Sequence, residues 1–181
     1  TRRGGWVLRG QGLDQSAQRP FQVLEGVVGD VAAAVLAEPE LGTALRASIG
    51  DHAGTVVATF PGLRTVLGVA TEVPVGPEQF AEARGLPALV TLIESLGTPE
   101  RPAVVLMDDC QWTDELTLKL FARWQERRDR GMTHATHVLL VVAFRSEEVG
   151  AQHMLRTLNG ATSLVLAQFG EHRAYARRHR R

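Results

Sequence analysis

Two neighbouring carboxylates end an apolar run in the stretch PAVVLMDDCQWTDE, residues 102–115. Asp108 and Asp109 are like charges that repel each other, and removing either one from water is costly. We therefore expect a cation close to the pair, or continued contact of the pair with water. This is the first place in the chain where the residue types indicate chemistry.

The run before the carboxylates reads as a strand. Residues 103–107, AVVLM, are aliphatic throughout, which is typical of a strand buried on both faces. Residues 137–144, HVLLVVAF, predict a second strand of this kind, and residues 162–169, TSLVLAQF, a third. Helical patterns separate these runs, so the sequence predicts an α/β fold with a parallel sheet.

The rest of the chain predicts mainly helices with Pro and Gly at their breaks. A short strand within residues 5–14 runs into a Gly-punctuated loop. A helix is expected from Pro20, followed by short helical pieces over 37–54 that break at Pro39 and Gly50, and by a helix from Val56 to Leu63 that is interrupted at Pro61–Gly62. A loop at 68–77 then leads to a helix over 80–96, with a possible new start at Pro87. An amphipathic helix through Leu116 and Trp124 and a short helix over 152–158 complete the set.

The order of these elements places the carboxylates where ligands bind. In an open parallel sheet, ligands lie beyond the carboxyl ends of the strands, and Asp108 and Asp109 follow the 103–107 strand at that end. An acidic pair after buried aliphatic residues is the Walker B arrangement of P-loop NTPases, in which one acid holds Mg²⁺ and its neighbour polarises the attacking water. The alternative is a strand that simply runs into a polar turn.

An arginine follows the next strand. In VVAFRSEEV, residues 141–149, Arg145 ends the apolar run and could reach a γ-phosphate, the role called sensor 1 in P-loop enzymes. The alternative is a structural ion pair of Arg145 with Glu147, Glu148 or Asp109. The order of the two strand ends favours the nucleotide site.

Length and composition limit the class of protein. The 181 residues suffice for one domain, and 20 Lys and Arg balance 20 Asp and Glu, which gives no general attraction to nucleic acid or to anionic membranes. Cys110 is the single cysteine, so no internal disulfide forms, and a reducing cytoplasm is expected. No apolar stretch approaches the roughly 20 residues of a membrane span. The basic tail, residues 170–181, is expected to be disordered, with a nucleic-acid arm as the less favoured alternative.

Four stretches carry a family resemblance: residues 10–27, residues 60–68, residues 82–120 with DDCQWTDE, and residues 141–149. On these, the chain resembles the AAA-type, STAND-like P-loop ATPase module of large bacterial multi-domain signalling proteins, which include sensor kinases and transcriptional regulators. The resemblance spans residues 5–168, and DDCQWTDE, which is similar to the family's Asp-Asp-x-x-Trp-x-Asp signature, is its most specific part.

The resemblance implies a three-layer P-loop NTPase-like parallel sheet that binds ATP and Mg²⁺. It implies that Asp108 is the acid linked to Mg²⁺, Asp109 the catalytic acid that polarises water, and Arg145 the γ-phosphate sensor, which serves both binding and catalysis. Trp112 is expected to pack the turn after the strand, and Thr113 or Asp114 to cap the next helix. For Arg84 a surface ion pair is expected, and for Cys110 an inert, half-buried thiol.

The phosphate-binding motif G-x-x-x-x-G-K-[ST] is absent from the sequence, whose only lysine is Lys119. Residues 1–169 are therefore expected to be a partial, N-terminally truncated ATPase domain that lacks the Walker A strand and loop. Without them the 137–144 strand keeps an unpaired edge, or residues 162–169 close the gap. The expected function is that of a fragment of a regulatory ATP switch, joined in its parent to kinase or regulator domains and inactive alone.

Two other functions compete with this one. The first is a non-catalytic protein-interaction scaffold with the same fold. The second is a metal-dependent hydrolase built on the two aspartates and nearby histidines. The second is disfavoured because His134 and His137 precede their strand, at the opposite end of the sheet from the acids.

Overall fold

The structure, a computed structural model, describes residues 4–14, 19–69, 81–131 and 137–157. Its sheet contains β1 (Trp6–Gln11), β2 (Ala103–Asp108) and β3 (Val138–Val142) in the order β1-β2-β3. Both pairings are parallel. The predicted α/β fold with a parallel sheet is confirmed for these strands, whereas the strand predicted at residues 162–169 and the basic tail lie outside the described residues.

The helices begin and end largely where Pro and Gly predict. They are α1 (Glu25–Ala37), α2 (Pro39–Ile49), α3 (Ala53–Thr59), α4 (Ala81–Ser95), α5 (Glu115–Asp129) and α6 (Met154–Thr157), with short 3-10 helices η1 (Gln22–Leu24), η2 (Gly50–His52), η3 (Pro61–Leu63) and η5 (Cys110–Trp112). The breaks at Pro39, Gly50 and Pro61 are confirmed. The possible restart at Pro87 does not occur, because α4 continues through this proline. No helix within the described ranges is long and apolar enough to cross a membrane.

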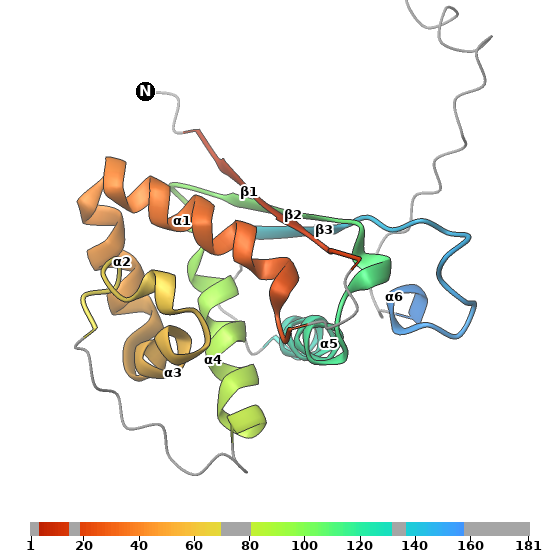
Figure 1. Cartoon of the computed structure of the whole chain (residues 1–181). Coiled ribbons are helices and arrows are strands. Elements are labelled where there is room, and N and C mark those ends of the chain that lie inside the picture. The colour runs from red at the N-terminus through yellow and green to blue at the C-terminus, as the bar shows by residue number, and fades with distance from the viewer. Residues whose placement is uncertain (1–3, 15–18, 70–80, 132–136, 158–181) are drawn as a thin grey trace, which may run out of the picture.

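Helices α1 to α5 lie on one face of the sheet (Figure 1). Side chains of a strand alternate between its two faces, and Leu8, Val105 and Met107 point toward these helices and are almost completely buried. Together with the apolar faces of the helices they form one core. This core fixes the sheet against the helices and thereby the position of the strand ends.

The other face of the sheet is less covered than the sequence predicts. Val7, Leu139 and Val141 are 45%, 56% and 37% exposed. The prediction that 137–144 is a strand buried on both faces is therefore wrong for β3, which is also shorter than predicted. The physical reason is that the described helices cover only the face that carries Val138 and the other inward residues.

The register of the strands brings three chain segments together at the carboxyl ends of the strands, which we call the carboxyl edge of the sheet. Asp108 at the end of β2 lies opposite Gln11 at the end of β1, and Met107 lies opposite Val142 at the end of β3. Arg145 follows β3 by three residues. The parallel order therefore places the residues that follow β2 and β3 side by side.

Candidate functional site

The site begins with the turn that follows β2. Asp108 is exposed, and its Oδ1 accepts a hydrogen bond of 2.9 Å from the backbone N–H of Asp109. Asp109 adopts a left-handed conformation with φ 50° and ψ 37°, which turns the chain out of the sheet into η5. An aspartate tolerates this region better than a branched residue does. The carboxylates of Asp108 and Asp109 consequently lie in different surroundings.

Backbone hydrogen bonds fasten this turn to both neighbouring strands. The N–H of Gly12 donates to the carbonyl of Asp108 at 2.9 Å, and the N–H of Cys110 donates to the carbonyl of Ala143 at 2.9 Å. The approach on the β1 side is close, because a Cβ on Gly12 would lie 2.3 Å from the carbonyl oxygen of Asp109. Only glycine fits there, so the turn is held rigidly between the two strand ends.

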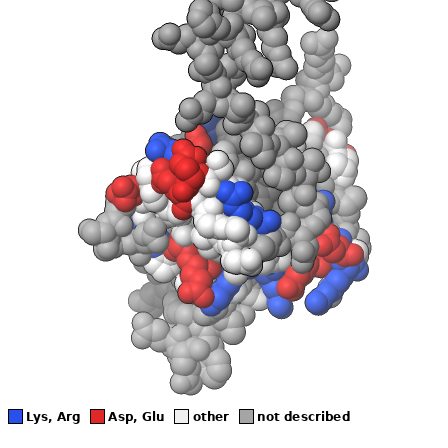
Figure 2. Space-filling view, turned by 90° about the vertical axis from the view of Figure 1, so that its right-hand side faces the viewer, with Lys and Arg blue, Asp and Glu red and all other residues white. Residues whose placement is uncertain are grey.

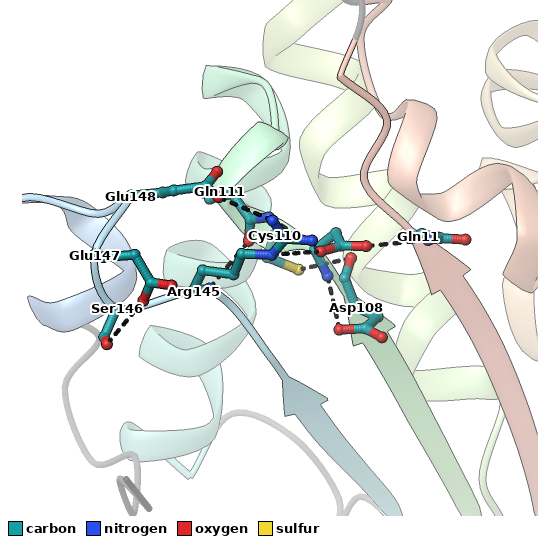
Figure 3. A network of polar contacts seen from close by, with 9 residues as sticks. Gln11, Asp108, Cys110, Gln111, Arg145, Ser146, Glu147 and Glu148 are labelled. Atoms are coloured by element: carbon teal, nitrogen blue, oxygen red, sulfur yellow. Dashed lines mark hydrogen bonds and ion pairs between the residues drawn. The ribbon is translucent and has the colours of Figure 1, made fainter. Parts of the chain in front are cut away.

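Both oxygens of the Asp109 carboxylate have partners, which come from Gln11, Gln111 and Arg145. These three residues are labelled in Figure 3. Oδ2 accepts from Gln11 Nε2 at 3.1 Å, Oδ1 accepts from Gln111 Nε2 at 3.0 Å, and Arg145 Nε lies 3.7 Å from Oδ1. The pKa of Asp109 is lowered, first by the Gln11 hydrogen bond, then by the one from Gln111, with a smaller contribution from the Arg145 charge and against the effect of burial. Asp109 is thus a well-held, ionised carboxylate.

Arg145 makes the ion pairs that the sequence offered as an alternative role. Its Nη1 lies 3.1 Å from Glu148 Oε1, in addition to the pair of Nε with Asp109, and its side chain is 55% exposed. The guanidinium also lies 5.5 Å from the centroid of the Trp112 ring, a cation–π distance. The structure therefore brings Arg145 to the aspartates, and in the same place gives it protein partners.

The loop that carries Arg145 is attached to the fold by Arg156. The guanidinium of Arg156 donates to the carbonyls of Ser146 at 2.6 Å and Val149 at 3.0 Å. It also lies 5.6 Å from the ring centroid of Phe144. These contacts fix the chain direction after β3, and with it the position of Arg145.

Asp114 is the residue that caps α5. Its Oδ1 accepts from the N–H of Thr117 at 3.0 Å, and its Oδ2 accepts from the N–H of Phe21 at 3.0 Å. Phe21 has a left-handed backbone with φ 62°, so the carboxylate ties the segment before η1 to the start of α5. The predicted helix cap is confirmed for Asp114, and it is structural.

The remaining sequence candidates stay outside the polar site. Cys110 is completely buried rather than half-buried, and burial raises the pKa of its thiol to about 11, which disfavours reactivity. Arg84 lies half-buried in α4. His137 directly precedes β3 at the opposite end of the sheet, and His134 lies outside the described residues.

Two glutamines of the site escaped the sequence analysis. Gln11 is the residue opposite Asp108 in the register, and Gln111 lies two residues after Asp109. Gln111 also accepts a hydrogen bond of 3.2 Å from the N–H of Arg145 through its Oε1. The spacing Asp-x-Gln and a polar residue at the end of a neighbouring strand were the available indications, but glutamines are common at such exposed positions.

Carboxylates outnumber the arginine at this edge. Asp109 and Glu148 both pair with Arg145, and Asp108 lies beside Asp109. In the view onto this end of the molecule, acidic and basic side chains lie next to each other, and the atoms that are not grey show no continuous basic surface (Figure 2). An anion would therefore meet repulsion unless a cation accompanied it.

The Asp108 carboxylate is of the kind that binds a magnesium ion. Asp108 presents an exposed carboxylate whose hydrogen bond involves Oδ1, and Mg²⁺ prefers oxygen ligands, often one or two carboxylates with phosphate oxygens and water. Within the described ranges, no group of three or more His, Cys, Asp or Glu side chains could hold a metal by itself. Asp108 is thus the residue that would meet Mg²⁺ brought by a phosphate ligand.

Comparisons with protein-family models, with curated proteins and with solved structures found no match to this chain.

Proposed function

We propose that this chain forms part of a regulatory nucleotide switch of the P-loop ATPase type, in which the carboxyl edge of the sheet meets the phosphates of MgATP. The observation that carries the proposal is the meeting of Asp109 and Arg145. They come from the ends of two adjacent parallel strands, and their side chains lie 3.7 Å apart. This is the arrangement expected of a Walker B acid pair with a sensor arginine, and the resemblance noted in the sequence supports the three-layer P-loop fold.

Each residue has a distinct part in this proposal. Asp108, exposed at the end of β2, would hold Mg²⁺, which neutralises phosphate charge. Arg145 would donate to a terminal phosphate oxygen, a task suited to a planar guanidinium. Asp109 was expected to polarise the attacking water, but its two oxygens already accept hydrogen bonds from Gln11 and Gln111. We assign it instead to holding the edge together.

The phosphate-binding loop is the part that the 181 residues do not contain. A loop of backbone N–H groups with a lysine supplies much of the phosphate affinity of these modules. The chain alone is therefore expected to bind MgATP only in the millimolar range and not to hydrolyse it. In a longer chain that supplies such a loop, joined to kinase or regulator domains in the cytoplasm, the same edge would respond to the nucleotide state.

Titration with MgATP, followed by amide chemical shifts in NMR, tests this function. We expect shifts confined to the segments around Asp108 to Trp112 and Arg145 to Glu148, with no comparable change when Mg²⁺ is omitted. Asp108→Asn should remove the Mg²⁺ dependence. Asp51→Asn, an exposed acid in η2 far from the sheet edge, is the matched control and should behave like the unaltered chain.

Two results would contradict the proposal. One is an absence of shifts at this edge at roughly 10 mM MgATP, a concentration that corresponds to the weakest binding expected of these contacts. The other is a response of the same size in Asp108→Asn. Sequencing the coding region before Thr1 and testing the longer chain for ATP hydrolysis extends the test to catalysis.

A second function, a protein-interaction scaffold, is favoured by one observation. Val7, Leu139 and Val141 form an exposed apolar patch across the sheet face opposite the helices. Apolar patches of this kind often mark interaction surfaces. Leu139→Glu would weaken self-association or partner binding in sedimentation experiments if the scaffold function holds, and would leave the MgATP response unchanged.

A further inference from the structure

The contacts of Arg145 raise a question about its availability. A sensor arginine must offer its guanidinium to a phosphate, yet here Nη1 lies 3.1 Å from Glu148 Oε1 and Nε lies 3.7 Å from Asp109 Oδ1. The guanidinium carbon also lies over the Trp112 ring, 5.5 Å from its centroid. A phosphate that binds this arginine competes with Glu148 for the Nη1 donors and meets the repulsion of its carboxylate.

The two carboxylates differ in how much they depend on Arg145. Asp109 accepts hydrogen bonds from Gln11 and Gln111 on its two oxygens, so it keeps partners when the arginine moves away. Glu148 contacts Arg145 at the shorter distance, and its own backbone N–H donates to the carbonyl of Arg145 at 3.1 Å. This turn holds the two side chains three residues apart in the chain and next to each other in space.

Gln111 fixes the base of the arginine in the same arrangement. Its amide donates to Asp109 and accepts from the backbone N–H of Arg145, so the backbone of Arg145 is tied to the turn after β2. The guanidinium can therefore exchange partners while its backbone remains in place. What changes on phosphate binding is the partner of the side chain, with Glu148 as the group that is released.

We propose that Glu148 is an autoinhibitory residue that occupies Arg145 in the absence of nucleotide and lowers the affinity of the sheet edge for phosphate. This inference rests on the proposed nucleotide function of the same site. It defines a regulatory step, because Glu148 and a phosphate compete for the Nη1 donors of Arg145 and repel each other. Release of the Glu148 side chain is the change that attached domains would sense.

The neighbouring residue supplies a matched control. Glu147 carries the same charge, one position away, but accepts a hydrogen bond of 3.3 Å from Ser146 Oγ. Glu147→Gln removes one negative charge from the loop without removing the partner of Arg145. Glu148→Gln removes the same charge and also the ion pair. A difference between the two variants thus reports the contact rather than the general field of the loop.

The test has two measurements on the 181-residue chain. In the absence of nucleotide, exchange of the Arg145 Nη1 protons with water is followed by NMR, and we expect it to be about two- to fivefold faster in Glu148→Gln and unchanged in Glu147→Gln. In MgATP titrations, Glu148→Gln should bind about two- to fivefold more tightly than the unaltered chain. Adding Arg145→Met to Glu148→Gln should remove this gain.

The outcomes separate this inference from the function on which it rests. Equal affinities in Glu148→Gln and the unaltered chain, or equal gains in both glutamate variants, would overturn the autoinhibitory role. If no variant binds MgATP, the nucleotide function fails, and the exchange measurement then tests only whether Glu148 contacts Arg145. Faster exchange confined to Glu148→Gln would support the Glu148 contact, and unchanged exchange would refute it.

Discussion

The two ends of the strands carry similar sets of side chains in different surroundings. We call the end where the strands begin the amino edge, in contrast to the carboxyl edge where they finish. At the amino edge, Arg101 lies 5.8 Å from the ring centroid of Trp6 and pairs with Glu38 at the start of α2. At the carboxyl edge, Arg145 lies 5.5 Å from the ring centroid of Trp112 and pairs with Glu148. Each cluster thus joins an arginine, a tryptophan and a glutamate.

The clusters differ in charge balance and in exposure. Arg101 is 32% exposed at its side chain, compared with 55% for Arg145. Trp6 donates its indole N–H to the carbonyl of Leu96 at 2.7 Å, which ties β1 to the end of α4. At the carboxyl edge, Asp109 and Asp108 add negative charge beyond what Arg145 balances.

In our proposal, this difference separates a structural cluster from one that binds a ligand. At the amino edge, Arg101 joins the start of α2 to β1 through its contacts with Glu38 and the Trp6 ring. An excess of carboxylates around one exposed arginine is poorly compensated by the protein itself, and a cation or a phosphate with its cation would complete it. The same residue types therefore serve packing at one edge and, in our proposal, binding at the other.

The largest effects should come from the glycines at the two edges. A Cβ on Gly12 would lie 2.3 Å from the carbonyl oxygen of Asp109, and one on Gly97 would lie 2.2 Å from that of His137. Because backbone must move in both cases, each change to alanine should lower the free energy of unfolding by about 2–3 kcal/mol, measured by urea denaturation. Only Gly12→Ala should also alter the NMR signal of the Arg145 Nε–H.

Gly29 in α1 is the control for the loss of glycine itself. A Cβ added to Gly29 would meet no other atom within 4 Å, so Gly29→Ala should stabilise the chain by about 0.5–1 kcal/mol. If Gly97→Ala disturbed the Arg145 signal as much as Gly12→Ala does, the two edges would be mechanically coupled and their comparison would lose its basis.

The sequence predicted the elements of both edges but not their contacts. The aliphatic runs gave β2 and β3, Pro and Gly gave the helix breaks, and the order of strands placed Asp108, Asp109 and Arg145 at one edge. These features follow from periodicity and from the geometry of parallel sheets. Whether the chain belongs to the ATPase family that it resembles stays a prediction.

The parts that escaped prediction depend on tertiary contacts. Gln11 and Gln111 reach Asp109 because the register of β1 and the left-handed turn at Asp109 bring them there. Burial on both faces was inferred for β3 from its composition, yet Leu139 and Val141 are exposed, since composition does not show which face the helices cover. A choice between Asp109 and Glu148 as partner of Arg145 was equally beyond the sequence, and the structure shows both.

The next effect in size concerns the two arginines. Arg101→Met keeps the length of the side chain but removes its pair with Glu38 and its contact with Trp6, and should cost about 1 kcal/mol of unfolding free energy. Arg145→Met should change stability by less than about 0.5 kcal/mol, because its pairs are more exposed, while abolishing the MgATP response. Thermal unfolding and the NMR titration measure the two properties separately.

Reversed results would break the comparison between the edges. A larger loss of stability in Arg145→Met than in Arg101→Met would make the carboxyl cluster the structural one. A MgATP response that survived in Arg145→Met and was lost in Arg101→Met would move the binding function to the amino edge, where Arg101 pairs with Glu38.

The smallest effect comes from the pH dependence of a third arginine–carboxylate pair, away from both edges. Glu94 in α4 and Arg127 in α5 lie 3.2 Å apart, and burial raises the pKa of Glu94 more than the Arg127 charge lowers it. Because the pKa of Glu94 is raised in the folded state, its protonated form contributes to the stability of the fold at pH values below the unfolded pKa of about 4.3. This contribution is lost as the pH rises through the pKa of the folded state. Glu94→Gln should therefore gain stability relative to the unaltered chain between pH 4 and pH 7, by less than about 1 kcal/mol.

Asp109 should behave in the opposite way, and this contrast checks both assignments. Because the pKa of Asp109 is lowered in the folded state, its charged form contributes to the stability of the fold at pH values above the unfolded pKa of about 3.9. This contribution is lost as the pH falls through the pKa of the folded state. Asp109→Asn should therefore lose stability relative to the unaltered chain as the pH rises from 3 to 5, because the variant lacks the hydrogen-bonded charge. Urea unfolding of both variants across pH 3–7 gives the two slopes. Slopes of the same sign would show that general charge, and not the local contacts of Gln11 and Gln111 with Asp109, sets the ionisation at the carboxyl edge.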